Sequence, residues 1–143
     1  MKTEISAGGI IVRKIKTSWH VLLIKDMNGN WTFPKGLVEK NEDTLATAKR
    51  EISEEVGIVQ IKSLKKLDPF RYTYTRDGDL IQKTVHYYIF LVSGSEIAHP
   101  QQDEGITEVA WRELYEAKNS IGYEKTNVSI LEDVTSFLSS YGH

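Results

Sequence analysis

Three glutamates lie close together in the segment Arg50-Glu-Ile-Ser-Glu-Glu55, and carboxylates at this spacing can bind a metal ion. At about 100° per residue, a helix places Glu51 and Glu55 about 40° apart and turns Glu54 further outward along the same side. Carboxylates four residues apart repel each other, so we expect a positive charge beside them. Arg50 stands four residues before Glu54, but one guanidinium cannot satisfy three carboxylates. A divalent cation can, and hard oxygen ligands without histidine or cysteine favour Mg²⁺ or Mn²⁺.

The alternative interpretation of this segment is an ordinary solvated acidic face of a helix. A helix is indicated because apolar residues recur at spacings of three and four along residues 43–56, with Asp43 as the N-cap and Gly57 as the terminating residue. These apolar positions are Leu45, Ala48, Ile52 and Val56. They predict a buried stripe with Glu51 and Glu55 on its flank rather than on the solvent-facing back.

The spacing of residues 36–58 favours the metal-binding interpretation. It reads Gly, five residues, Glu, seven residues, and then Arg-Glu-Ile-Ser-Glu-Glu-Val-Gly-Ile, and it resembles the box of the Nudix hydrolase family at every defined position. The matching residues are Gly36, Glu42, Arg50, Glu51, Ile52, Glu54, Glu55, Gly57 and Ile58.

The rest of the sequence predicts a single α/β domain over residues 1–143. Short β-branched, apolar or alternating runs predict strands at 5–14, 19–25, 58–67, 70–75, 83–92 and 106–111. Turn residues predict loops at 31–36 and 99–105 and a hairpin turn at 76–79, and helical spacing predicts a helix at 124–141. The resemblance implies that these elements form a Nudix-type α/β/α sandwich on a mixed sheet.

Two adjacent glycines, Gly8 and Gly9, interrupt the first predicted strand. We expect a β-bulge there, and close approach of another backbone or a ligand is the alternative.

The resemblance also implies an activity, which is hydrolysis of a nucleoside diphosphate linked to another group, by attack of water at phosphorus with help from Mg²⁺ or Mn²⁺. The implied metal ligands are the carbonyl of Gly36 with Glu51 and Glu55, and Glu54 is either a further ligand or the group that orients or deprotonates the water. Arg50 is implied to act with Glu42 as a supporting pair. Such chemistry needs cations on the phosphate oxygens and an aligned water, not a covalent nucleophile.

Family members often add a glutamate from a loop beyond the box. Glu104, in the run Gln-Gln-Asp-Glu-Gly at 101–105, is the candidate for this catalytic role, and Glu108 is the second choice. The alternative for either residue is simple solvation.

Within the family, residues 31–36 and 83–88 resemble two signatures of the asymmetric diadenosine tetraphosphate hydrolases, and Tyr74 agrees with the marker tyrosine of that subgroup. Lys35 and Lys83 could neutralise a polyphosphate, and Tyr87 could stack on an adenine if its face of the strand opens to the cleft. One departure leaves the preferred nucleotide open, because Leu37-Val38-Glu39 stands where these hydrolases often have His and Gly.

Three functional hypotheses follow. The first is hydrolysis of diadenosine tetraphosphate to ATP and AMP. The second keeps the chemistry on another substrate: an oxidised nucleoside triphosphate, a capped or triphosphorylated RNA end, or an inositol pyrophosphate. The third is a nucleotide-binding module without turnover, whose expected signature, loss of one of the clustered glutamates, is missing here.

Composition limits the remaining possibilities. The 143 residues include no cysteine, which excludes disulfides and thiolate chemistry, and the net charge of −2 provides no general attraction for nucleic acid or an anionic membrane. No run approaches the roughly 20 apolar residues that cross a bilayer. We therefore expect a cytoplasmic protein, a monomer or homodimer, whose partner is a small-molecule nucleotide and which forms no stable complex with nucleic acid.

Overall fold

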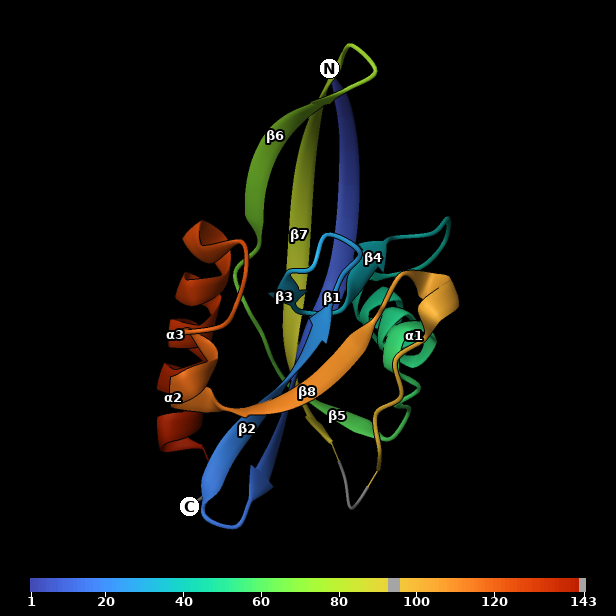
Figure 1. The fold of residues 1–143 in the computed structure, drawn as a ribbon. Coiled ribbons are helices and arrows are strands. Elements are labelled where there is room, and N and C mark those ends of the chain that lie inside the picture. Colours follow the sequence, from blue (N-terminus) through green and yellow to red (C-terminus); the bar gives the residue numbers. More distant parts are fainter. Residues whose placement is uncertain (93–95, 142–143) are drawn as a thin grey trace.

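Two long strands form the centre of an eight-stranded mixed sheet in the computed structural model, which describes residues 1–92 and 96–141. Strand β1 (Lys2–Ile15) runs parallel to β7 (Asp79–Val92), with pairs from Lys2↔Ile81 to Val12↔Leu91. Both strands are buried along the half that the helices cover. The other half projects from the body of the molecule together with β6 (Figure 1).

The remaining strands all pair antiparallel with their neighbours. Strand β1 pairs with β2 (Ser18–Lys25) and β4 (Lys35–Leu37). Strand β2 also pairs with β3 (Trp31–Thr32) and β8 (Glu108–Glu113). Strand β7 pairs with β5 (Ile61–Lys66) and β6 (Phe70–Arg76). The mixed sheet is therefore confirmed.

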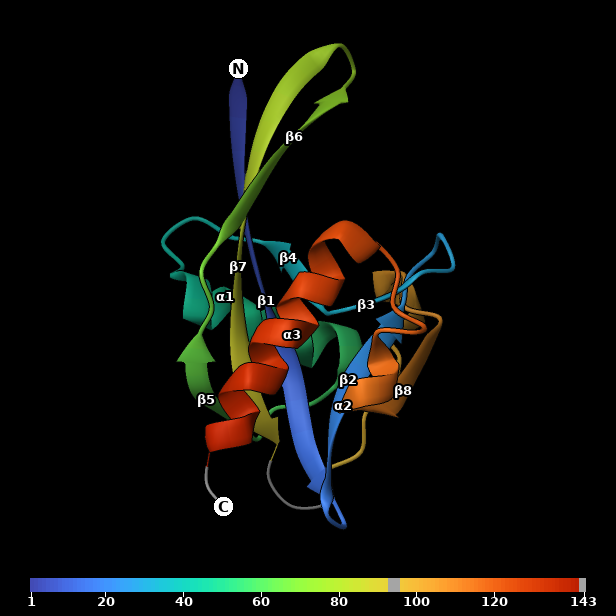
Figure 2. The same ribbon diagram turned by 90° about the vertical axis from the view of Figure 1, so that its left-hand side faces the viewer.

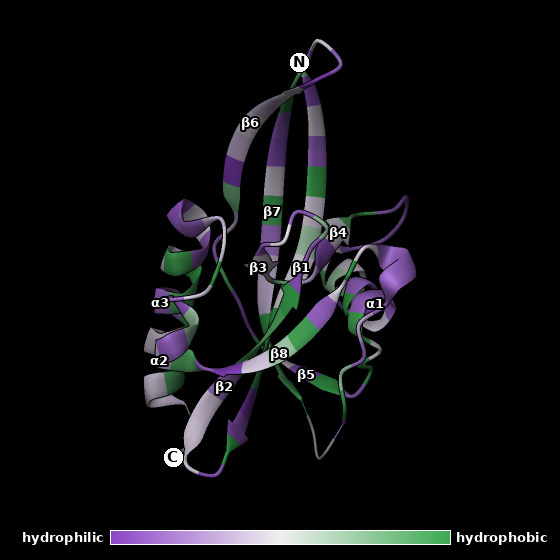
Figure 3. Ribbon diagram, in the orientation of Figure 1, coloured by the Kyte–Doolittle hydropathy of each residue, from purple (hydrophilic) through white to green (hydrophobic). Residues whose placement is uncertain are grey.

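Helices cover both faces of this sheet and create two hydrophobic cores. Helix α1 (Thr44–Val56) packs its apolar stripe on one face, around Ile11 and Phe90. Helices α2 (Leu114–Ala117) and α3 (Glu124–Ser140) cover the other face, around Ile10 and Ile89 (Figures 1 and 2). Both long helices carry hydrophobic and hydrophilic residues, as the amphipathic patterns predicted (Figure 3). Among the described residues, no helix combines the length and the apolar character that crossing a bilayer requires.

Several expectations from the sequence were wrong in detail. The segment 31–36, expected as a loop, contributes β3 and β4, which were too short to predict. The short helix α2 was not expected, and the loop at 99–105 contains a 3₁₀ turn, η1 (Gln102–Glu104). The hairpin turn between β6 and β7 and both long helices were correctly expected.

The bulge expected at Gly8 and Gly9 was also wrong, because β1 keeps an unbroken register with β7 through both residues. The glycines instead allow close approach. A Cβ on Gly8 would collide with the carbonyl oxygen of Pro34, which accepts a hydrogen bond from the Gly9 N–H at 3.1 Å. A Cβ on Gly9 would lie 2.6 Å from a ring carbon of Phe90 and 2.7 Å from Cδ1 of Ile52. The pair therefore allows β4 and α1 to pack against β1.

The substitution Gly9→Ala tests this packing. Because the added methyl group must displace Phe90 and Ile52, we expect the free energy of unfolding to fall by about 1–3 kcal/mol in urea titrations. The control is Thr75→Ala at an exposed position of β6. A gain in stability, which alanine gives at an unstrained glycine site with free space, would contradict the close approach.

Candidate active site

Helix α1 is fixed at both ends, and this sets the direction of its acidic side chains. The Asp43 carboxylate accepts a hydrogen bond of 2.7 Å from the Ala46 N–H, and Gly57 adopts a left-handed conformation with φ of 73°. Since the apolar stripe faces the sheet, Glu51 and Glu55 are turned along one flank, toward β4.

The flank carrying Glu51 lies directly against the backbone of β4. A Cβ on Gly36 would overlap the carboxyl group of Glu51, so a larger residue there would displace this carboxyl group from the backbone of β4. The contact brings two of the residues implied as metal ligands side by side, although they are separated by 15 positions in the sequence. The glycine at the start of the motif therefore leaves the space that the Glu51 carboxyl group occupies.

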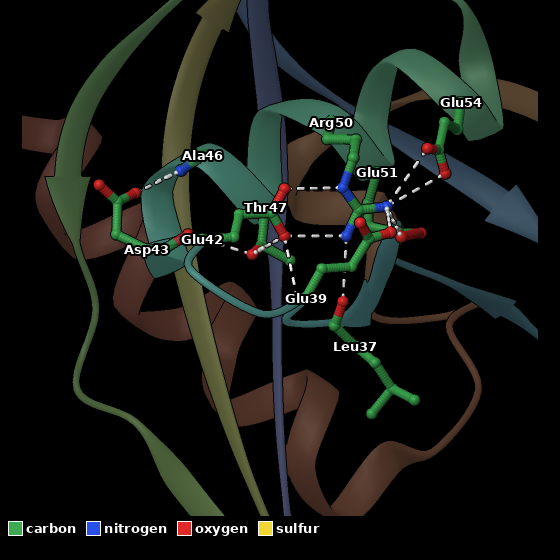
Figure 4. Close-up of polar contacts among 9 residues, drawn as sticks. All are labelled: Leu37, Glu39, Glu42, Asp43, Ala46, Thr47, Arg50, Glu51 and Glu54. Atoms are coloured by element: carbon green, nitrogen blue, oxygen red, sulfur yellow. Dashed lines mark hydrogen bonds and ion pairs between the residues drawn. The ribbon is translucent and has the colours of Figure 1, made fainter.

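Arg50 joins the loop before α1 to the helix (Figure 4). Its Nε and Nη2 donate to the two carboxylate oxygens of Glu42 at 2.8 and 3.0 Å, and Nη2 also donates to the carbonyl oxygen of Leu37 at 3.0 Å. Thr47 adds a hydrogen bond of 2.6 Å to Glu42. The hydrogen bonds from Arg50, followed by that from Thr47, lower the pKa of Glu42 to about 2.

The remaining nitrogen of Arg50 is shared between two of the clustered glutamates. Nη1 lies 2.8 Å from Glu51 and 3.2 Å from Glu54 (Figure 4). It makes no contact with Glu55, whose side chain belongs to a residue only 6% exposed and whose Oε2 has no hydrogen-bond partner among the described residues. Burial raises the pKa of Glu55 well above its usual range, and the neighbouring carboxylate of Glu51 raises it further.

These residues fit a divalent cation. A buried carboxylate oxygen without a partner is costly unless a cation or hydrogen bond satisfies it, and all the donors here are hard oxygens. Within the described part of the chain, no three acidic or imidazole side chains already converge as a ready metal cluster. The contacts of Arg50 explain this spread, because they draw Glu51 and Glu54 toward the guanidinium. A bound cation would therefore compete with Arg50 for these two carboxylates.

Glu104 lies near the same cluster. Backbone hydrogen bonds join His99 and Gln101 to the last turn of α1, and η1 follows directly. Partial desolvation raises the pKa of Glu104, and the charges of Glu54, Asp103 and Glu51 contribute to the increase. Its side chain is exposed, so it could contact a ligand held above the cluster. The second choice, Glu108, instead forms an ion pair of 3.2 Å with Lys25.

A cavity of about 460 Å³ opens on the opposite face of the sheet from α1, between β6, β7 and the start of α3. Its volume lies within the range of small-molecule sites. Four of the nine residues that line this aromatic cavity are aromatic, and the full set is Asp26, Thr32, Lys35, Phe70, Tyr72, Tyr87, Tyr123, Thr126 and Asn127. Two of the predicted substrate-binding residues, Lys35 and Tyr87, are therefore placed together.

Lys35 connects this cavity electrostatically with the acidic flank. It precedes Gly36 in β4, and neighbouring residues of a strand point to opposite faces. Burial and the charge of Lys83 lower the pKa of Lys35 to about 8, whereas the carboxylate of Glu55 acts in the opposite direction. The lysine is therefore close enough to interact with both the cavity and the cluster.

The other predicted substrate-binding residues lie in different settings. Tyr87 is only 3% exposed, and its ring stacks on Phe70 at 6.0 Å, so little of the ring is free for a base. Tyr74 lies further out on β6, where its hydroxyl donates to Glu4. Lys83 pairs in register with Glu4 and is half-buried, which lowers its pKa. Neither Tyr74 nor Lys83 lines the cavity.

Sequence reasoning missed most of the cavity wall. Every second position of β6 from residue 70 to 74 is aromatic, namely Phe70, Tyr72 and Tyr74. This spacing could have identified an aromatic face of the strand, because residues two apart point to the same side. Their rings follow one another at 6.1 and 6.0 Å. Tyr123 and Asn127 had no comparable signal, because they reach the cavity from the C-terminal segment.

Comparison with known proteins relates almost the whole chain to one protein family. The sequence model of the family described as the NUDIX domain matches residues 2–134 of this chain. The putative mutator protein MutT4 of Mycobacterium tuberculosis is 32% identical over 97% of this chain and 58% of its own length, and the mRNA-decapping enzyme subunit 2 of Arabidopsis thaliana is 28% identical over 79% and 29%. The chain thus spans less than two thirds of the length of these curated relatives.

Solved structures show the same arrangement of elements. The C. elegans Ap4A hydrolase, in a binary complex, has a TM-score of 0.80 at 25% identity and covers 96% of this chain and 99% of its own. The E. coli dihydroneopterin triphosphate pyrophosphohydrolase has a TM-score of 0.75 at 15% identity, with coverage of 95% and 99%. At that lower identity the likeness concerns the fold alone.

The lowered pKa of Glu42 makes a prediction about acid stability. A carboxylate whose pKa is lower in the folded state stabilises the fold above its unfolded pKa of about 4.3, and this contribution is lost as the pH falls toward 2. We therefore expect Glu42→Gln to be less stable than the wild type at pH 7 and the gap to narrow between about pH 4.3 and 2.

Urea unfolding midpoints at a series of pH values would measure this gap, with Glu132→Gln on the exposed side of α3 as the control. A gap of constant size across this pH range would show that the charge of Glu42 does not stabilise the fold.

Proposed function

Because this chain belongs to the NUDIX domain family, whose members generally use a divalent metal ion, we propose that it is a Mg²⁺-dependent pyrophosphohydrolase that cleaves nucleotide substrates by attack of water at phosphorus. The observation that carries the proposal is the buried carboxyl oxygen of Glu55 that has no hydrogen-bond partner among the described residues. Glu55 lies beside Glu51, which packs against Gly36, and it interacts electrostatically with Lys35. Mn²⁺ is the alternative ion.

The carbonyl of Gly36 with Glu51 and Glu55 would hold the metal ion, and Glu54 would serve as a further ligand or would orient and deprotonate the water. When bound, the ion supplies positive charge to the phosphate oxygens, which stabilises charge that develops as the P–O bond breaks. Glu104, exposed near the cluster, is the second candidate for accepting the proton of the water.

Two basic residues have different parts in this scheme. Arg50 holds the loop at 37–42 against α1 through Glu42, and its role is to position the glutamates. Lys35, at the border between the cavity and the acidic flank, neutralises a phosphate of the substrate.

The substrate that we propose is diadenosine tetraphosphate, cleaved to ATP and AMP. An aromatic cavity beside a lysine suits a nucleoside followed by phosphates, and the likeness to the C. elegans Ap4A hydrolase extends over almost the whole chain. In this proposal the nucleoside lies among Phe70, Tyr72 and Tyr123, with Tyr87 as the wall behind Phe70. Tyr74 and Lys83 would contact the substrate further along the hairpin of β6 and β7.

A second candidate keeps the same chemistry on a triphosphorylated or capped RNA end. It is favoured by the decapping enzyme already described and by the RNA pyrophosphohydrolase of Caulobacter vibrioides, which is 33% identical over 58% of this chain. An inositol pyrophosphate offers no apolar surface to an aromatic cavity, and a binding module without turnover would not need the complete set of glutamates.

The first prediction for this function concerns Glu55. Glu55→Gln keeps the shape of the side chain but removes the charge that would hold the metal ion, so kcat should fall by at least about 100-fold. The thermal unfolding midpoint of the metal-free protein should change little, because burial already favours the neutral carboxyl group of Glu55 and glutamine is a neutral side chain of the same shape. Assays over a titration of Mg²⁺, with Glu132→Gln as the control, would measure the effect. Near-normal activity of Glu55→Gln would refute the metal assignment.

The second prediction concerns the substrate. With Mg²⁺, the protein should convert diadenosine tetraphosphate to ATP and AMP, which are separated and quantified by ion-exchange chromatography. A panel with an oxidised nucleoside triphosphate, a triphosphorylated RNA and an inositol pyrophosphate provides the comparison. Turnover of one of these compounds with none of diadenosine tetraphosphate would eliminate the proposed substrate and retain the chemistry.

A further inference from the structure

Strand β6 has an open edge. It pairs with β7 along one side, and no other described residue forms a hydrogen bond to its main chain on the opposite side. Together with β7 and β1 it projects beyond the helices (Figure 1). An edge of this kind presents unpaired N–H and C=O groups, which can pair with a further strand.

The hairpin turn between β6 and β7 determines which residues present these groups. Its two central residues have φ of 53° and 82°, as in the type I′ turn of a two-residue hairpin. A hydrogen bond closes such a turn at the flanking pair, Arg76 and Asp79, and bonded and non-bonded pairs then alternate along the ladder. The main-chain groups of Arg71, Thr73 and Thr75, which are all exposed, therefore point away from β7.

The sequence of β6 favours strand pairing at this edge. Apart from its two arginines, every residue of the strand is aromatic or β-branched, and none is the lysine or proline that commonly protects an edge. Strand β5 lies along the same side of β7 and differs, because it contains three lysines and a register shift between Ser63 and Lys65. The unprotected part of the edge is therefore β6.

The start of this edge is positively charged on the α1 side of the sheet. Lys66 and Arg71 pair with residues 88 and 84 of β7, and His86 lies between these positions on the same face. Burial lowers the pKa of the His86 imidazole, and the charges of Lys66 and Arg71 lower it further. Among the described residues, neither Lys66 nor Arg71 forms an ion pair with a carboxylate.

The opposite face of the edge is aromatic. The ring of Tyr72 lies between those of Phe70 and Tyr74, and the residue is 40% exposed. A strand added to β6 would meet two cations on one face and this aromatic surface on the other. Because side chains alternate between the faces of a strand, a segment in which acidic and apolar residues alternate would complement both.

We propose that β6 binds an extended acidic segment of a partner protein by strand addition. The main chain of the segment pairs with the outward-facing groups of β6, its carboxylates lie beside Arg71 and Lys66, and its apolar side chains cover Tyr72. Because Tyr72 lines the aromatic cavity, the bound segment also extends the wall of that cavity. The proposal does not depend on the substrate or on turnover.

Two other occupants match the edge less well. The β6 strand of a second copy would bring Arg71 and Arg76 of that copy toward the same cations, and like charges repel across paired strands. The phosphate oxygens of a nucleic acid could meet the cations and the N–H groups, but they would leave the C=O groups of the edge without donors. A peptide strand with carboxylates satisfies the N–H groups, the C=O groups and the charge.

The test uses a short capped peptide in which valine and glutamate alternate, and a matched peptide with lysine in place of glutamate. NMR titrations of the wild-type protein, without metal ion or nucleotide, follow the backbone amides. We expect saturable binding of the glutamate peptide with a Kd at least about 10-fold lower than that of the lysine peptide. Hydrogen exchange at the N–H groups of Thr73 and Thr75 should slow in the complex.

Two positions locate the binding. Thr73→Pro removes an outward N–H that the ladder with β7 does not use, so peptide binding should be lost, whereas Thr73→Val keeps the N–H and should bind as the wild type does. Arg71→Glu reverses the charge at an exposed position and should remove the preference for the glutamate peptide. The charge reversal remains a test even if Thr73→Pro does not fold.

No saturable binding of the glutamate peptide, equal Kd values for the two peptides, an unchanged preference in Arg71→Glu, or wild-type binding by a folded Thr73→Pro would each overturn the proposal. Tighter binding of a uridine oligonucleotide to the same amides, or dimerisation that shifts these amides, would also overturn it and would assign the edge to nucleic acid or to a second copy. Failure to hydrolyse diadenosine tetraphosphate would remove the proposed function alone.

Discussion

The guanidinium of Arg50 positions most of the acidic side chains around α1, and its hydrogen bonds do not extend to Glu55. Its donors are occupied by Glu42, the carbonyl of Leu37 and the two nearer glutamates of the cluster. Glu55 lies one turn further along the helix from Glu51 and receives none of this charge, although it is the most buried of the three. The fold therefore leaves one buried carboxyl oxygen without a partner, which a cation would satisfy.

Strand β4 joins the two faces on which catalysis and recognition would depend. Gly36 pairs with Ala7 and lies against Glu51 on the α1 side, whereas Lys35 pairs with Gly8 and lines the aromatic cavity on the other side. In the proposed function, the alternation of a strand would thus separate the metal-binding carbonyl of Gly36 from the phosphate-binding side chain of Lys35 by one residue. Such an arrangement requires β4 to approach β1 closely, and Gly8 provides the space.

The sequence predicted what is encoded locally. The spacing of α1, its cap at Asp43 and its end at Gly57 lie within one segment, so periodicity alone located the helix and the acidic flank. The contact between Gly9 and Phe90 could not be predicted, because it depends on a parallel pairing of residues 79 positions apart and on the packing of α1 above it. For the same reason Asn127 escaped notice, since its partner Thr32 lies 95 positions away.

The acidic flank and the aromatic cavity also differ in how much they indicate about the substrate. The acidic flank lies within the family motif, and the proteins similar to this chain include an RNA pyrophosphohydrolase and an Ap4A hydrolase. The family motif alone therefore does not indicate which of these substrates the chain would take. The cavity is assembled from β6, β7 and the start of α3, outside the motif, and its aromatic side chains and the amide of Asn127 differ in kind from the carboxylates. In the proposed function, the segment that matches the family motif would thus supply the chemistry, and residues that only folding brings together would supply the selection of substrate.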